Sequence, residues 1–205
     1  MESRRERKKR QTRQLLVETA LRLFAEQGYE QTTVAQIAAA ADVSTKTFFN
    51  YFPTKDDVLF AETRERNEAP LALIAGRRPG ESVPDLLARV YETMIADYLA
   101  DADGAFRDPA VMRTYVDIVT TTPSLQAKGL HEVFALQRRV ADALVAAYPD
   151  ELDPVSAAAI VGSVVGATQA AALVSLARGD GEQEVWAAMR RGIEVALRGL
   201  DAYRA

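Results

Sequence analysis

The chain is 205 residues long, which is enough for one or two domains with a substantial buried core. It holds 25 Lys and Arg against 29 Asp and Glu, and this net charge of −4 taken alone argues against a nucleic-acid partner. It has no cysteine, which excludes disulfides and thiolate chemistry and is consistent with a cytoplasmic protein.

Positive charge is concentrated at the amino-terminal end. Residues 1–55 hold ten Lys and Arg against six Asp and Glu, a net +4, while residues 56–205 hold fifteen against twenty-three, a net −8. The densest basic run lies between Arg4 and Arg10, and it contains no apolar stretch typical of a signal peptide. By itself such a run indicates a solvated terminus. Beside a helix that reads DNA, it predicts phosphate contacts from residues such as Arg7 and Arg10.

Three helices are predicted first, at 7–27, 34–41 and 45–52. Thr33 and Gln36 have the T-x-x-Q spacing of a capping box, so Thr33 is expected to begin the second helix. Ser44 is a good N-cap for the third, and Pro53 ends it because the residue before a proline avoids the α region. Thr54 is then expected to cap the next helix, which begins at Lys55. Two short helices joined by a tight turn have the layout of a helix-turn-helix, whose second helix enters the DNA major groove.

The helix at 45–52 divides into two faces. Phe48 and Phe52 are four residues apart and are expected in the core. The opposite face carries a cation, an amide and two hydroxyls, which suit phosphate and base-edge contacts: Lys46, Asn50, Thr47 and Tyr51. A plain pair of antiparallel helices without DNA shows the same pattern, so the residues alone leave both interpretations open.

Six further helices are predicted, at 55–74, 84–101, 109–120, 123–147, 154–178 and 182–200. Prolines just inside polar caps mark several of their starts, and glycines or prolines mark their ends. No run of period-two alternation appears, so no sheet is expected. The sequence therefore predicts an all-α fold of nine helices, with a three-helix DNA-binding domain at 1–54 and a six-helix ligand-binding and dimerisation domain at 55–205.

The stretch 155–177 has no charged residue over 23 positions and raises the question of a membrane span. It holds only eight large aliphatic residues, together with Gln169, and this composition favours a helix buried between partners over a membrane helix. No membrane partner is expected.

The last two helices predict a homodimer. Small residues at Gly162, Gly166 and Ala170 leave room for another helix to approach closely, although such helices also pack inside monomers. The final helix has an apolar stripe that includes Val185, Met189 and Ile193, and two such helix pairs would form a four-helix bundle. Two heads related by a twofold axis would read a pseudo-palindromic operator.

The motifs of the common enzyme classes are missing. There is no G-x-S-x-G, no glycine-rich phosphate loop and no H-E-x-x-H, and His131 is the single histidine. Its mid-helix position is more typical of a packed or surface histidine than of a base. We expect neither enzymatic activity nor a cofactor, and no set of residues predicts a metal site.

The first 60 residues or so resemble the DNA-binding domain of the tetracycline-repressor (TetR) family of bacterial transcription factors. The resemblance covers under a third of the chain, and the rest is compatible with that family's helical ligand and dimer domain. It is carried by the helical stretch 15–24, Gly28-Tyr29, Thr32-Thr33-Val34, Ile37-Ala38, Val43-Ser44, Thr47-Phe48, Tyr51-Phe52 and Lys55.

The resemblance assigns roles to particular positions. Thr45, Lys46 and Thr47 correspond to the start of the recognition helix that meets the bases, and the preceding Ser44 is a further candidate for DNA contact. The positions that contact phosphates in the family correspond to Thr33, Tyr51 and Lys55. Two departures alter this pattern: Phe49 stands where the family usually has a tyrosine, so one phosphate-directed hydroxyl is missing, and Lys46 stands where a small residue is common.

The resemblance also implies a small-molecule pocket in the body, whose occupation changes the separation of the heads and so lowers operator affinity. The helix from Lys55 is then the expected lever. Residues that would line such a pocket, each of which also fits an ordinary core position, are Met94, Tyr98, Tyr115, Phe134, Gln169 and Trp186. The expected function is a dimeric repressor released by an inducer. The alternatives are an activator or DNA organiser without inducer, and a helical carrier or enzyme that does not bind DNA.

Overall fold

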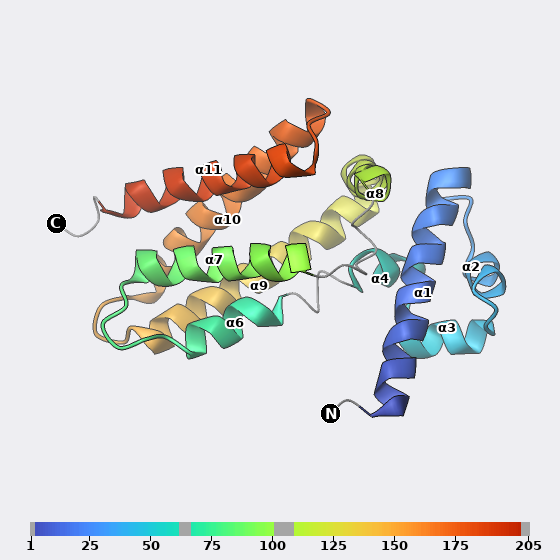
Figure 1. The fold of residues 1–205 in the computed structure, drawn as a ribbon, viewed down its shortest axis with the longest axis horizontal. Helices are drawn as coiled ribbons and strands as arrows, with labels where there is room; N and C mark the ends of the chain where they lie inside the picture. The colour runs from blue at the N-terminus through green and yellow to red at the C-terminus, as the bar shows by residue number, and fades with distance from the viewer. Residues whose placement is uncertain (1–2, 62–66, 101–108, 202–205) are drawn as a thin grey trace. The chain divides into compact units, whose positions relative to one another are not determined.

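The computed structural model describes residues 3–61, 67–100 and 109–201. Within these ranges the regular structure consists of ten helices and no strand, so the all-α prediction is confirmed, with one helix more than the nine expected (Figure 1). The chain divides into two compact units. The first comprises Met1–Arg64 and Asp103–Gly129, and the second comprises Glu65–Ala102 and Leu130–Ala205. The first compact unit extends beyond the predicted domain boundary at residue 54, and it includes a second segment of the chain.

The first unit contains α1 (Arg4–Gln27), α2 (Val34–Ala40), α3 (Thr45–Tyr51), α4 (Lys55–Leu59), α8 (Pro109–Thr121) and the beginning of α9 (Pro123–Ala147). Figure 1 shows α2 and α3 on the same side of α1. Apolar residues at helical spacing along α1 face these helices and form one core with them. Its fully buried members include Leu16, Ile37, Phe48, Val58 and Leu125.

The single helix predicted at 55–74 is wrong. α4 ends at Leu59, where Phe60 is the C-cap with φ −99° and ψ 6°, and α6 covers Glu68–Ala75. The four consecutive residues from Val58 to Ala61 are all buried, at 2% exposure or less. Four consecutive side chains point around most of the circumference of a helix, so the core covers this segment on nearly every side.

The second unit contains α6, α7 (Val83–Ala100), the remainder of α9, α10 (Pro154–Ala177) and α11 (Glu182–Asp201). The proline-marked starts of α9 and α10 are confirmed at Pro123 and Pro154. Figure 1 shows α10 and α11 running side by side as an antiparallel pair. The core of this unit is built from α6, α7, α9 and α10, and its most buried members include Ile74, Leu86, Leu144 and Ala157.

α10 and α11 approach each other closely at Gly192. A Cβ at this position would lie 2.6 Å from the carbonyl oxygen of Ala167 and 3.2 Å from the Cα of Thr168, so a larger residue does not fit. A Cβ at Gly162 or Gly166 would meet nothing within 4 Å. The close approach within the chain therefore uses a glycine of α11, and not the two glycines that the sequence singles out.

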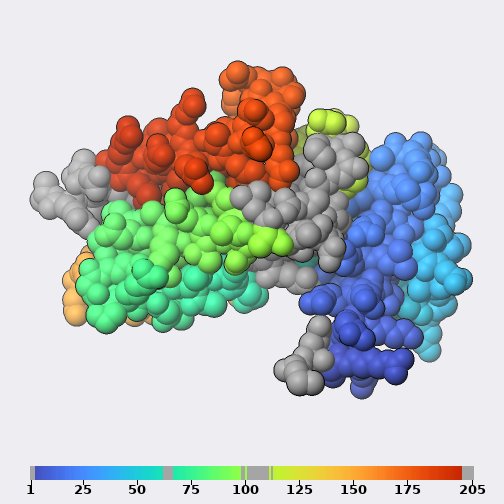
Figure 2. Space-filling model, in the orientation of Figure 1, coloured from blue at the N-terminus to red at the C-terminus, as the bar shows by residue number. Residues whose placement is uncertain are grey.

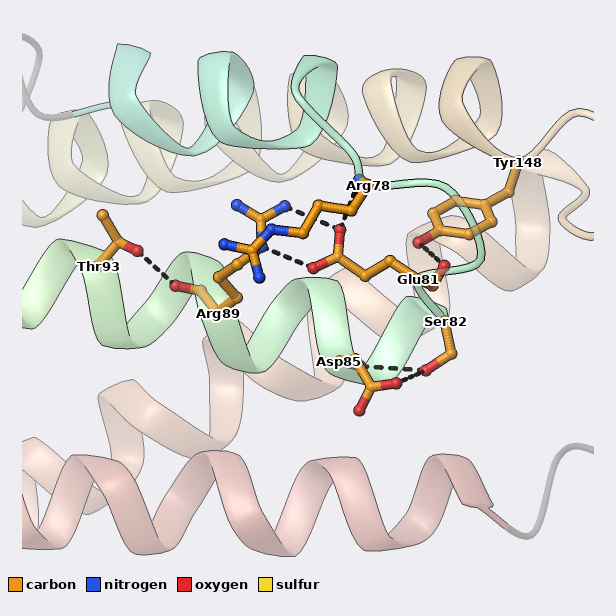
Figure 3. A network of polar contacts seen from close by, with 7 residues as sticks. All are labelled: Arg78, Glu81, Ser82, Asp85, Arg89, Thr93 and Tyr148. Carbon is orange, nitrogen blue, oxygen red and sulfur yellow. Dashed lines mark hydrogen bonds and ion pairs between the residues drawn. The ribbon is translucent and has the colours of Figure 1, made fainter.

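A polar network holds the turn between α6 and α7 (Figure 3). The carboxylate of Glu81 accepts hydrogen bonds from Nε and Nη2 of Arg89, at 2.6 and 2.9 Å, and one from the amide of Arg78. The hydroxyl of Tyr148 donates to the carbonyl of Glu81 at 2.9 Å, which ties the turn to the end of α9. The guanidinium of Arg77 stacks 3.9 Å above the ring of Tyr148.

α10 is long and apolar enough to cross a membrane by length and composition, with a mean hydropathy of 1.8. This value belongs to an 18-residue segment of α10, and 22% of the segment is buried within the described structure. A single helix of this kind is weak evidence for a membrane span, because helices that pack inside soluble assemblies have the same composition. Much of the apolar surface of α10 is therefore exposed in the single chain.

Candidate nucleic-acid interface

The turn between α2 and α3 is short and well defined. Asp42 adopts a left-handed conformation with φ 53°, which aspartate tolerates better than most residues. The amide of Val43 donates to the carbonyl of Ala38 at 2.9 Å and closes the turn. Val43 itself packs against the core of the first unit. The spatial relation of the two helices is therefore fixed by backbone hydrogen bonds and by packing.

Both ends of α3 behave as the sequence predicts. Ser44 is the N-cap, and its hydroxyl oxygen accepts from the amide of Thr47 at 3.0 Å. The hydroxyls of Ser44 and Thr47 lie 2.8 Å apart and form a hydrogen bond. The helix ends at Tyr51, and Phe52 adopts the extended backbone that a following proline favours. Because its hydroxyl takes part in the cap, Thr47 helps to hold the recognition helix in place.

The buried face of α3 anchors the helix in the head. Phe48 and Phe52 are 0% and 2% exposed, and their ring centroids lie 5.7 Å apart. The guanidinium of Arg13 lies 5.4 Å from the centre of the Phe52 ring, and its Nη2 donates to the carbonyl of Ala61 at 3.1 Å. Arg13 thus joins α1 to the ends of α3 and α4. No sequence motif points to this role.

The open face of α3 differs in part from the expected one. Thr47 and Tyr51 are half-buried, whereas Phe49 is 53% exposed. The exposed positions carry a hydroxyl, a cation, an aromatic ring and an amide: Thr45, Lys46, Phe49 and Asn50. A short helix with these groups facing outward has the shape and chemistry needed to enter a major groove.

Thr33 and Lys55, both expected to contact phosphates, also have structural contacts. Thr33 is the exposed N-cap of α2 and forms the predicted capping box with Gln36. Nζ of Lys55 donates to the carbonyls of Tyr29 and Thr32, at 2.7 and 3.1 Å, and lies 4.0 Å from the centre of the Tyr29 ring. These two bonds use two of the three donors of the ammonium group, and they hold the α1–α2 loop against α4.

The amino end of α4 forms a second polar cluster. Thr54 and Asp57 make a capping box, and Nζ of Lys128 at the start of α9 lies 3.0 Å from the Asp57 carboxylate. The hydroxyl of Tyr29 donates to Asp56, and burial, followed by this hydrogen bond, raises the pKa of Tyr29 above its usual range. The cap on α4 was predicted, but the contributions of Tyr29 and Lys128 were not. Their partners are distant in sequence and follow no regular spacing.

The basic amino terminus is an ordered helical extension. α1 begins at Arg4, three residues before the predicted start, because Ser3 and Glu6 form a capping box. Hydrogen bonds from the Ser3 amide and then its hydroxyl lower the pKa of Glu6. Residues 3–11 are all exposed, including Arg7 and Arg10. The first turns of α1 therefore extend beyond the core as a helix that carries six basic side chains.

The residues predicted to line a ligand pocket have different surroundings. Tyr115 packs against the core of the first unit and Met94 against that of the second. Trp186 is half-buried, Gln169 is exposed and Phe134 is 64% exposed. The Tyr98 side chain lies outside the described residues. Among the described residues, the Tyr91 hydroxyl and Nε of Arg77 are buried without a hydrogen-bond partner, and no group of three or more His, Cys, Asp and Glu side chains is arranged to hold a metal ion.

The residues predicted to form a dimer interface lie on α10 and α11. Gly166 and Ala170 are exposed and Gly162 is half-buried, so this face of α10 is open. Val185 and Met189 are half-buried, and Ile193 is 4% exposed and packs inside the chain. On the face drawn in Figure 2, the surface of the second unit is formed mainly by α6 and α7 (teal to green) and by α11 with the end of α10 (orange to red).

Near its carboxyl end, α10 exposes two large apolar side chains that its sequence pattern does not single out. Leu173 is 49% exposed and Val174 is 61% exposed. They continue the open stripe of Gly166 and Ala170 at spacings of three and four residues. Which apolar residues of α10 remain uncovered depends on where α11 packs, and that is not evident from an almost uniformly apolar sequence.

The amino-terminal region matches a known protein family. The family model for bacterial regulatory proteins of the tetR family covers residues 16–61. The transcriptional regulator TcmR of Streptomyces glaucescens is 34% identical over 149 residues, which are 73% of this chain and 66% of that protein. The chain thus spans slightly less than two thirds of the length of this relative. The family match contains α2, α3 and α4 together with the second half of α1.

Solved structures of similar fold extend over nearly the whole chain. A TetR-family transcriptional regulator from Mesorhizobium loti has a TM-score of 0.58 at 15% identity and covers 98% of both chains. FadR of Thermus thermophilus, a TetR-family repressor in complex with lauroyl-CoA, has a TM-score of 0.56 at 22% identity and covers 91% of this chain and 94% of its own. At these identities the likeness concerns the fold. TcmR and the two proteins of similar fold are all described as regulators of transcription.

Proposed function

The chain belongs to the TetR family of bacterial transcription regulators, and from this premise we propose that it is a homodimeric repressor that binds a pseudo-palindromic operator and leaves it when a small-molecule inducer binds. As a transcription regulator of this family it carries a helix-turn-helix DNA-binding domain. The observation that carries the proposal is the open face of α3, where Lys46 and Asn50 are exposed beside Thr45. Such a regulator acts in the cytoplasm, where the operator is.

Specific recognition is proposed to come from α3. Lysine donates to guanine O6 and N7, and asparagine pairs with adenine N6 and N7 in the major groove. Lys46 and Asn50 are four residues apart and so lie on the same face, within reach of neighbouring base pairs. The buried rings of Phe48 and Phe52 keep this face outward. Side chains held on a short rigid helix lose little freedom when they meet the bases.

Affinity is proposed to come largely from phosphate contacts. Residues 1–55 carry a net charge of +4, and the first turns of α1 present Arg7 and Arg10 in an ordered helix. Binding of basic side chains to phosphates releases counterions, so log K falls by about 0.9 for each contact per tenfold rise in salt. Thr33 and Tyr51 are the proposed neutral contacts, and Ser44 and Thr47 set the orientation of α3 through the cap.

A homodimer is proposed because a single head reads few base pairs. Two copies related by a twofold axis place two recognition helices ~34–36 Å apart, one turn of duplex. The exposed stripe of α10, from Gly166 through Ala170 to Val174, supports this arrangement, because a second copy of the same stripe would cover it. Val185 and Met189 of α11 lie beside this stripe in the proposed bundle, whereas the contribution of Ile193 is to hold α11 on its own chain.

An inducer is proposed to act by binding better to a form of the dimer whose heads do not fit the operator. Met94, Tyr98 and Trp186 are the candidates for its site in the second unit. The lauroyl-CoA bound by FadR makes acyl-CoA thioesters one class to include in a screen. A compound that raises the melting temperature and releases DNA supports this part of the proposal, and a broad screen without such a compound favours a regulator without inducer.

The DNA-binding claim is tested with the double variant Lys46→Ala/Asn50→Ala. Both side chains are exposed, so the fold and the melting temperature are expected to stay unchanged. Loss of two base contacts is expected to weaken operator binding at least about hundredfold in a fluorescence anisotropy titration. The control is Arg138→Ala, which removes an exposed cation from α9. Operator affinity equal to the wild type in the double variant would contradict the proposal.

A further inference from the structure

We propose that Phe49 reads a thymine in each half-site by packing its ring against the 5-methyl group in the major groove. This inference rests on the proposed function, and it adds one element of the operator: a thymine whose methyl group contributes to affinity. Phe49 is thus assigned as a specificity-determining residue.

The first observation is the exposure of the ring. Phe49 is 53% exposed, whereas Phe48 and Phe52 of the same helix are 0% and 2% exposed. It lies three residues after Lys46 and directly before Asn50, which are both exposed. A large apolar side chain in the middle of a polar, cation-bearing face leaves unfavourable apolar surface in water. Contact with an apolar group of the DNA that Lys46 and Asn50 bind would remove this surface from water.

The second observation is that the ring is held in place. Its centroid lies 5.6 Å from that of Phe48, and the planes meet at 87°, an edge-to-face contact with a fully buried side chain. The Phe49 ring therefore projects from α3 in a direction set by the core. A side chain oriented before binding loses less conformational freedom when it reaches its target.

The chemistry of the ring limits the choice of target on DNA. Phenylalanine has no hydrogen-bonding group, so Phe49 contacts neither phosphate oxygens nor the polar edges of bases by hydrogen bonds. In the major groove, the apolar group that a base pair presents is the 5-methyl group of thymine. The side chains around Phe49 are suited to polar base edges, and the ring is suited to this methyl group.

The experiment compares thymine with uracil, which lacks only the methyl group. Duplexes that bind the wild-type homodimer are first selected from a random library, and each thymine of a selected half-site is then replaced in turn by uracil. At one position, or at two adjacent ones, the change is expected to weaken wild-type binding about fourfold, the effect of one buried methyl group. The same change in both half-sites is expected to weaken binding about fifteenfold.

The variant Phe49→Ala identifies the residue that senses the methyl group. It is expected to bind the thymine duplex more weakly than the wild type and to bind the thymine and uracil duplexes equally. Phe49→Leu keeps an apolar contact and is expected to retain part of the preference for thymine. Lys46→Ala is the matched control, since it is expected to lower affinity for both duplexes while keeping the difference between them. Melting temperatures establish that each variant is folded.

Three results would overturn the inference. Equal binding of thymine and uracil duplexes by the wild type would exclude the methyl contact while leaving the proposed function intact. A preference for thymine that persists in Phe49→Ala would assign the contact to another residue. If the wild type selects no duplex from the library, the proposed function fails together with the inference.

Discussion

At the scale of single residues, α3 separates side chains that build the head from side chains that face outward. Ser44 and Thr47 bond to each other at its start, and Phe48 and Phe52 fill the core. Lys46 and Asn50 are exposed and take no part in the cap, so their replacement tests recognition apart from folding. Lys55, by contrast, bonds to two backbone carbonyls, and its replacement would alter the α1–α2 loop as well as any phosphate contact.

One prediction at this scale concerns Tyr91 of α7. Burial raises its pKa to about 12, and its hydroxyl has no hydrogen-bond partner among the described residues. Because a buried unpaired hydroxyl is unfavourable, Tyr91→Phe is expected to leave the free energy of unfolding unchanged or to raise it by up to about 1 kcal/mol. Urea denaturation measures this difference. A loss of more than about 1 kcal/mol would show that the hydroxyl is satisfied in solution.

At the scale of elements, sequence patterns predicted helices well where they depend on local signals. The caps at Thr33, Ser44 and Thr54 were all predicted from residue type and spacing, and all three are present. Features that depend on contacts between distant segments were missed. The break after Leu59 lies in a segment that is buried on nearly every side, and the tight contact at Gly192 depends on how α10 and α11 pair.

Gly192 gives a prediction about the pairing of α10 and α11. Gly192→Ala places a methyl group 2.6 Å from a backbone oxygen that cannot move independently, so we expect a loss of about 1–3 kcal/mol in the free energy of unfolding. Gly199→Ala, on the same helix, meets nothing within 4 Å and is expected to be neutral or to stabilise by up to about 1 kcal/mol. Chemical denaturation of both variants measures the contrast. Equal effects would mean that the two helices do not approach closely at Gly192.

The turn between α6 and α7 gives a prediction about acid stability. Hydrogen bonds from the Arg89 side chain and then the Arg78 amide lower the pKa of Glu81 from its ordinary 4.5 to about 2. Between pH 4.5 and about 2, Glu81 is protonated in the unfolded chain and remains ionised in the folded protein. The stability that Glu81 contributes is therefore complete above pH 4.5 and declines as the pH falls toward about 2.

The measurement is the difference in melting temperature between the wild type and Glu81→Gln across this pH range. The wild type is expected to be the more stable protein above pH 4.5, with a difference that shrinks on acidification. Glu194→Gln, at an exposed position of α11, serves as the control and is expected to differ little from the wild type at any pH. A Glu81→Gln difference that does not change with pH would contradict the assigned network.

At the scale of the whole molecule, the open stripe of α10 is proposed to be covered by a second copy. Val174 is 61% exposed in the single chain, so Val174→Lys is expected to leave its fold intact. In a homodimer the same change buries a charge and is expected to weaken association at least about hundredfold. Analytical ultracentrifugation measures this. Phe134→Lys, which replaces an equally exposed ring on α9, is the control and is expected to remain dimeric.

The expected link between association and function is also at this scale. Val174→Lys is expected to lose operator affinity although its heads are unchanged, because a monomer engages only one half-site. A dimeric Val174→Lys protein, or a wild type that is monomeric at micromolar concentration, would contradict the proposed interface. The sequence identified this region as apolar and rich in small residues, but which side chains are exposed follows from the packing of α11.

The most direct test of the account is to sequence the genomic DNA fragments that the purified protein retains without any added effector. The wild type is expected to enrich a small set of fragments that share an inverted repeat, and Lys46→Ala/Asn50→Ala is expected to enrich none of them. If the wild type retains no fragment more strongly than bulk competitor DNA, the open face of α3 does not read sequence, and the central claim is wrong.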